Sequence, residues 1–266
     1  MSVRPPAVAD LFYPADVQAL RAMIDGFISK AQSTLPLRPS TKPKALIAPH
    51  AGYIYSGQCA AYAYATLLAA KPQRVVLLAP AHRLPFYGMA LSSADAFATP
   101  FGTIALDQQL NEQLLTLPDV AINDAAHAQE HAIEVHLPFL QHLLGDVSLL
   151  PVCIGTVDPL AVSALLAQLW SLPETLFLIS SDLSHYHPYA TANAIDQQSI
   201  AKILQFQPLS HTEACGATGI NGLLTLAAQH HLTPQLLDYR NSGDTAGDKE
   251  RVVGYAAIAF DTAERA

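Results

Sequence analysis

Short apolar runs alternate along this chain with stretches in which apolar residues recur at helical spacing. The runs contain almost no polar position, so each strand that they predict would be buried on both faces. They cover residues 44–50, 74–82, 148–155, 175–182 and 251–261. Strands of this kind are typical of a mostly parallel sheet with helices packed on both of its faces.

Three stretches between the runs predict helices. Two of them extend from about Gln58 to Ala70 and from about Cys215 to Gln229. In the third, "DPLAVSALLAQLW", the positions of one helical face are Val162, Leu165, Leu166 and Leu169. Residues 86–124 have weaker periodicity and are placed only loosely. The alternation predicts an α/β fold, a single three-layer αβα domain over residues 1–266 with a mostly parallel mixed central sheet.

The composition limits the classes of partner. Apolar residues make up 51% of the chain and charged residues only 14%, against roughly 25% charged residues in an ordinary soluble domain. Such a chain exposes little charged surface, so we expect a homo-oligomer interface. The formal net charge is -8 and no block of Lys or Arg occurs, which argues against nucleic acid as a partner.

The cysteines and the first residues bear on the cellular compartment. "MSVRPPAVADLFYP" lacks the apolar core of a signal peptide, and the three cysteines have no paired spacing. Both features favour a reducing cytoplasm. No apolar run approaches the ~18 residues of a membrane span, so no interaction with a membrane is expected.

Polar side chains gather where the predicted strands end. His50 closes the first strand, His82 follows the second, and "SSDLSHYHPY" supplies Asp182 and His185 after the fourth. Because ligands bind beyond the carboxyl ends of parallel strands, these groups are expected to converge on one edge of the sheet. A single loop His is as often merely solvated, but the agreement of three strand ends favours a functional site.

A cysteine adds a further candidate. "EACGATGINGLL" places Cys215 at the start of a predicted helix. A helix N-terminus lowers the pKa of a thiol and favours the thiolate, which is the form that binds metal or attacks carbon. The alternative is a buried, inert thiol, which is how we interpret Cys59 and Cys153.

The stretch "QEHAIEVHLPFLQHLL" carries His131 and Glu134 at i, i+3 on one helical face. The spacing His-x-x-Glu-x-His matches neither motif of the zinc peptidases, so a protease is not predicted. A role in orienting the ligands of a site suits the pair better than direct ligation, and a solvated helix face is an equal alternative. Pro138 is expected to kink this helix or to mark its start.

Seven motifs taken together resemble the Memo family, whose bacterial members are called protein B of the AmmeMemoRadiSam system. In chain order they are "FYPAD", "APHAGYIYSG", "LLAPAHR", "EHAIEVHLPFLQ", "SSDLSHYHPY", "ACGATGINGLL" and "NSGDTAGDKERVVGYAA". They run from Phe12 to about Phe260, which is essentially the whole chain. Any one of them would be weak evidence, but seven in order are highly specific.

The resemblance implies the fold of the class III extradiol dioxygenases, with a vestibule at one edge of the sheet. It implies metal ligands at His50, His82 and Cys215, and Asp182 and His185 in the same pocket. His185 matches the acid–base His of the dioxygenases, so we take it and Asp182, which would orient it, as candidate catalytic residues. The implied cofactor is a transition metal, Fe(II) or copper, with zinc as a further option. The implied partners are an Ammecr-domain protein and a radical-SAM protein.

One departure from the dioxygenases bears on the chemistry. Those enzymes hold Fe(II) with two His and a carboxylate, whereas the third ligand here would be Cys215. A thiolate is softer, favours copper or zinc, and can itself be oxidised. The departure argues against ring cleavage and leaves metal binding intact.

Four functions are compatible with the sequence. The favoured one is a His/His/Cys redox-metal site acting in the AmmeMemoRadiSam system. The second is an extradiol-type dioxygenase that uses His185 as base on an unknown small molecule. The third is a metal-free hydrolase or transferase with Cys215 as nucleophile. The fourth is a module that binds a partner protein or peptide without turnover.

Overall fold

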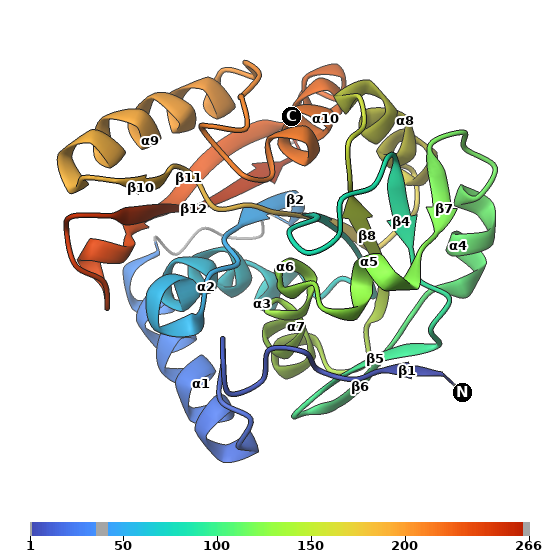
Figure 1. Ribbon diagram of the computed structural model, residues 1–266, viewed down its shortest axis with the longest axis horizontal. Coiled ribbons are helices and arrows are strands. Elements are labelled where there is room, and N and C mark those ends of the chain that lie inside the picture. Colours follow the sequence, from blue (N-terminus) through green and yellow to red (C-terminus); the bar gives the residue numbers. More distant parts are fainter. Residues whose placement is uncertain (1, 36–41, 263–266) are drawn as a thin grey trace.

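The computed structural model describes residues 2–35 and 42–262, and these residues build a mixed nine-stranded sheet between helices (Figure 1). Its middle consists of four neighbouring strands, in the order β2 (Pro43–Ala48), β9 (Thr175–Ser180), β3 (Arg74–Pro80) and β8 (Ser148–Ile154). All three pairings among them are parallel. The four predicted runs therefore form the buried centre of the sheet.

The strands that adjoin this centre on either side, β12 (Val252–Asp261) and β4 (Met89–Leu91), run antiparallel to it. β12 pairs antiparallel with β2, and β11 (Thr233–Asn241) and β10 (His185–His187) pair antiparallel with β12. At the other side, β4 is antiparallel to β8, while β7 (Val120–Ile122) is parallel to β4. The predicted α/β class with a mixed central sheet is confirmed, and its parallel part is the centre.

The loosely placed stretch around residues 86–124 contributes β4 and β7 and a separate small sheet. In that sheet β5 (Ala96–Thr99) lies between β1 (Val3–Arg4) and β6 (Gly102–Ala105). The first residues of the chain are thereby tied to a segment almost a hundred residues away.

Two helical layers cover the sheet and bury separate apolar clusters on its two faces (Figure 1). The first layer contains α1 (Val17–Thr34), α2 (Gln58–Ala65), α3 (Leu67–Ala70), α5 (Asp124–Ala128), α6 (His131–Glu134) and α7 (Leu137–Leu144). The second contains α4 (Gln108–Leu114), α8 (Pro159–Leu169), α9 (Tyr189–Leu204) and α10 (Ala217–Gln229). Pro138 lies in the first turn of α7, so it marks a helix start as expected.

The ends of the central strands position the site. His50 follows the end of β2 by two residues, His82 follows β3 by two, and Asp182 follows β9 by two. Because these strands are parallel, their carboxyl ends meet at one edge. Cys215 lies two residues before α10 and is joined to the same edge by its backbone N–H, which donates to the Asp182 carbonyl.

Within residues 2–35 and 42–262, none of the helices combines the length and apolarity that a membrane crossing needs. The single-domain range 1–266 stays a prediction, and residues 1, 36–41 and 263–266 lie outside the described part of the chain.

Candidate metal centre

The three predicted metal ligands meet at the carboxyl edge of the sheet. Donor atoms of His50, His82 and Cys215 all lie within 4.8 Å of one another. The Cys215 Sγ atom is 3.4 Å from His50 Nε2, and the ring centroids of the two His are 5.0 Å apart. His50 is buried, whereas the His82 side chain keeps 29% of its exposure. The group is therefore accessible from the His82 side.

A buried hydroxyl fixes the orientation of His50. The Ser180 hydroxyl donates to the Ala132 carbonyl at 2.7 Å, so it can only accept from the two imidazoles that contact it. His50 Nδ1 lies 2.7 Å and His136 Nε2 lies 2.8 Å from this oxygen. His136 Nδ1 then accepts from the Tyr64 hydroxyl. This chain places the proton of His50 on Nδ1 and leaves its Nε2 lone pair facing Cys215.

A buried carboxylate does the same for His82. The Nδ1–H group of His82 donates to Glu130 Oε1 at 3.0 Å, and the backbone N–H of His82 donates to Glu130 Oε2 at 2.6 Å. Burial alone would raise the pKa of Glu130, but hydrogen bonds from His82 and Ala132 outweigh it and lower the pKa to about 2. The carboxylate is thus ionised, and Nε2 of His82 is left free for an ion.

We expect Glu130→Gln to weaken transition-metal binding by about 10- to 100-fold, the usual cost of losing the hydrogen-bond partner of a ligating His. An amide cannot accept at both of its ends, so it releases either the ring or the backbone N–H of His82. Competition titration with a metal indicator measures the change. Glu112→Gln, an identical substitution on the exposed surface of α4, is the control. Equal affinity of the two variants would contradict the orienting role.

The pKa of Cys215 differs from the one expected from the sequence. The sequence predicts a thiol whose pKa is lowered by the start of a helix, yet burial and the neighbouring Asp182 carboxylate raise the pKa of Cys215 to about 12. The close approach that brings this sulfur to His50 depends on Gly216, where a Cβ would lie 2.6 Å from the Ser180 carbonyl oxygen. Without a bound cation the sulfur is therefore a protonated thiol, which disfavours the metal-free nucleophile.

Asp182 and His185 both lie at the site, but among the described contacts each has a different hydrogen-bond partner. Asp182 Oδ1 accepts from the backbone N–H of His50 at 2.8 Å, and its Oδ2 lies 3.9 Å from His50 Nε2. Burial raises the pKa of Asp182 to about 7. His185 is oriented instead by the Leu183 carbonyl, to which its Nδ1 donates at 2.8 Å. Asp182 thus holds the His50 backbone, and the catalytic pairing of Asp182 with His185 stays a prediction.

His131 faces the ligands, whereas Glu134 does not. The His131 ring lies 4.7 Å from that of His82 and 5.5 Å from that of His50, centroid to centroid. Burial lowers the pKa of His131 to about 4, so the ring is neutral. Glu134 points toward the start of the chain and accepts from Arg4, Ala7, Val8 and Tyr13. The carboxylate that orients a ligand is thus Glu130 and not Glu134.

His82, Glu130 and His131 form a second group of donor atoms within 4.8 Å of one another. In this group the Glu130 carboxylate already accepts from His82 at both of its oxygens. In the His50, His82 and Cys215 group no carboxylate is already occupied in this way, and the group is the better candidate for an ion among the described residues.

Sequence reasoning missed four residues that orient the ligands: Tyr64, Glu130, His136 and Ser180. Three of them, Glu130, His136 and Ser180, stood inside quoted motifs. Glu130 directly precedes His131, and Ser180 opens "SSDLSHYHPY". A carboxylate next to a His and a hydroxyl at the end of a buried strand were the available signals.

Comparisons with known proteins match this chain over nearly its whole length. Residues 4–259 match the family model described as Memo-like protein. A MEMO1 family protein of Aquifex aeolicus is 35% identical, covering 98% of this chain and 100% of its own length. Another, of Methanosarcina barkeri, is 37% identical over 96% of this chain and 99% of its own. A crystal structure of an uncharacterized protein from Escherichia coli K12 aligns with a TM-score of 0.48 at 13% identity, covering 80% of this chain and 98% of its own.

Proposed function

This chain belongs to the Memo-like family, and on that premise we propose that it binds one transition-metal ion through His50, His82 and Cys215. The observation that carries the proposal is the direction of the two imidazoles. Ser180 and Glu130 occupy the two Nδ1 positions and leave both Nε2 lone pairs unused, and Nε2 of His50 lies 3.4 Å from the Cys215 sulfur. Burial lowers the pKa of His50, so this ring is in the neutral form that metals require.

We propose iron or copper as the ion, in a redox role within the AmmeMemoRadiSam system. A thiolate with two imidazoles suits copper, iron or zinc better than the hard cations Mg²⁺ and Ca²⁺. When bound, such an ion supplies Lewis acidity and, for iron and copper, electron exchange. Three protein donors leave a position for an external molecule, as in catalytic metal sites. The partial exposure of His82 provides access to it.

The protein residues around the ligands supply proton handling. The Nδ1–H of His185 is held by the Leu183 carbonyl, so its Nε2 can accept a proton. Burial lowers the pKa of His185, which keeps the ring neutral at neutral pH. His185 is also close enough that its charge would lower the pKa of His50. These features support an acid–base role for His185 and favour an extradiol-type dioxygenase as the second candidate function.

Metal analysis tests the proposal. We expect protein purified without added metal to contain about one equivalent of iron or copper per chain by inductively coupled plasma mass spectrometry. Anomalous scattering at the iron, copper and zinc edges should place the ion between His50, His82 and Cys215. A metal-free protein that also fails to take up iron, copper or zinc would refute it.

Oxygen uptake separates the two candidates. The iron(II)-loaded protein with a panel of catechols should consume oxygen only if it acts as a dioxygenase. The Ammecr-domain and radical-SAM partners and the cytoplasmic location remain predictions of the family resemblance.

A further inference from the structure

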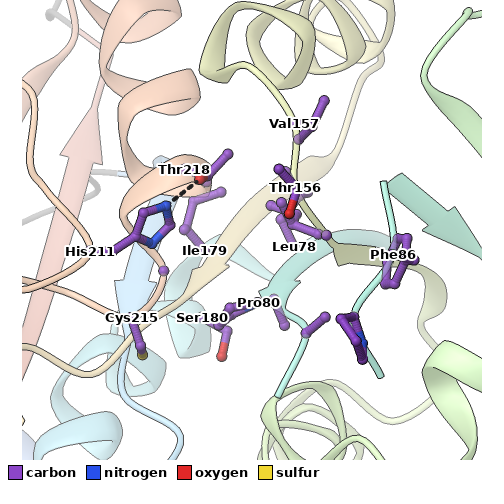
Figure 2. Close-up of a pocket in the computed structure, with 17 residues that line it drawn as sticks. Leu78, Pro80, Phe86, Thr156, Val157, Ile179, Ser180, His211, Cys215 and Thr218 are labelled. Carbon is purple, nitrogen blue, oxygen red and sulfur yellow. Dashed lines mark hydrogen bonds between the residues drawn. The ribbon is translucent and has the colours of Figure 1, made fainter. Parts of the chain in front are cut away.

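A cavity lies beside the metal centre, on the face of the sheet covered by α8 and α10. Its volume is about 290 Å³, near the lower end of the about 300–1,000 Å³ of small-molecule sites. The ends of β3, β8 and β9 and the first turn of α10 enclose it (Figure 2). The cavity is large enough for a molecule of about one ring.

The residues that line this cavity include no Asp, Glu, Lys or Arg. Most of the lining is apolar, including Leu78, Phe86 and Ile179. Other polar groups of the lining are Thr156, across the cavity from Cys215, and a pair on the same side as Cys215 in which the Thr218 hydroxyl lies 3.2 Å from His211 Nε2 (Figure 2). An anion or cation would lose its hydration here without gaining a counter-charge, which is costly. A neutral molecule with one hydrogen-bonding group would meet no such penalty.

The cavity and the metal centre share a wall. Cys215 and Ser180 line the cavity, and both also contact His50, through the sulfur at 3.4 Å and the hydroxyl at 2.7 Å. Figure 2 shows the Cys215 sulfur and the Ser180 hydroxyl pointing away from the His211–Thr218 pair, so they face the metal centre. A molecule in the cavity would therefore pack against the cysteine that holds the ion.

We propose that this cavity binds a compact, neutral, mostly apolar molecule with a single hydroxyl or carbonyl group. The polar group bonds to Thr156 or to the His211–Thr218 pair, and the apolar part packs between the ends of β3 and β9. The contact with a metal ligand rests on the proposed function, whereas binding in the cavity does not.

Calorimetric titration of the full chain with benzyl alcohol tests the proposal, with benzoate as an anion of similar size. We expect benzyl alcohol to bind and benzoate to bind at least about 10-fold more weakly. Thr156→Trp fills the cavity from an exposed position whose side chain has no hydrogen bond among those described, and should weaken benzyl alcohol binding by at least about 10-fold. Leu160→Trp, on the 64% exposed Leu160 outside the cavity lining, should not.

The same titration on cobalt(II)-loaded protein tests the shared wall. Saturation of the cavity should shift the thiolate–cobalt absorption band, and an unchanged band would overturn the contact with Cys215. Equal binding of benzyl alcohol to wild type and Thr156→Trp, or no binding to wild type, would overturn the proposal that the cavity binds a neutral molecule. If cobalt fails to bind while metal-free protein still takes up benzyl alcohol, the proposed function falls and the cavity stands.

Discussion

Protein in which Cys215 is replaced by alanine is expected to lose the transition metal that the wild type retains. The two imidazoles remain, but the substitution removes the only sulfur near His50 Nε2 among the described residues. Loss of a ligand should cost more than the about 10- to 100-fold that follows loss of an orienting partner. Metal content after gel filtration, followed by indicator competition, measures the effect. His82→Ala should also lose the metal, and the partial exposure of the His82 side chain limits the effect of this substitution on the fold.

Cys59→Ala is the matched control for this prediction. Cys59 is also a free thiol, although fully buried where Cys215 is partly buried, and its sulfur contacts the Asp238 carbonyl and not an imidazole. Its alanine variant should keep the metal of the wild type. If Cys215→Ala retained metal at wild-type affinity, the Cys215 sulfur would not be a ligand, and at most the two imidazoles would hold the ion. Thermal melting of each metal-free variant separates metal loss from unfolding.

The convergence of His50, His82 and Asp182 could be predicted because it depends on strand ends, whereas Cys215, which precedes α10, was assigned as a ligand only through the family resemblance. His50, His82 and Asp182 each follow a buried apolar run, and such runs are readable without knowledge of their neighbours. Once the runs are parallel, their carboxyl ends must meet. The antiparallel direction of β12 was not readable in this way, since a strand buried on both faces has the same pattern in either direction.

The choice of Glu130 over Glu134 as the carboxylate that orients a ligand could not be predicted, because it depends on where the helix begins and breaks. The sequence pattern carries one helical face across residues 131–144, which favours Glu134 as a neighbour of His131. The helix instead begins at His131, with Glu130 as its N-cap, and breaks before Leu137. As the N-cap, Glu130 reaches His82, whereas Glu134, at the last position of this short helix, reaches Arg4 near the start of the chain. The raised pKa of Cys215 likewise follows from burial and from Asp182, which no spacing reveals.

Replacement of Glu134 by glutamine is expected to cost about 3–5 kcal/mol of the free energy of unfolding, the usual result of breaking a buried ion pair. Glu134 is 0% exposed and lies 2.6 Å from the Arg4 guanidinium, which is itself buried. Its two oxygens also accept from the backbone N–H groups of Ala7 and Val8 and from the Tyr13 hydroxyl. An amide group presents a donor to one of these sets, so a buried donor is left unpaired.

Denaturant unfolding of the metal-free protein measures this effect, and Glu112→Gln is again the matched control, since it makes the same change at an exposed position. The double variant Arg4→Met with Glu134→Gln should recover part of the loss, because the Arg4 charge is no longer left unpaired and the amide oxygen still accepts from part of the set formed by Ala7, Val8 and Tyr13. The effect should also reach the metal centre: Phe12, on the segment that Glu134 holds, packs on His131 with 4.7 Å between ring centroids. We therefore expect faster hydrogen exchange in residues 4–13 of Glu134→Gln than in the control. A loss below about 1 kcal/mol, the range of exposed ion pairs, would show that this anchor is dispensable.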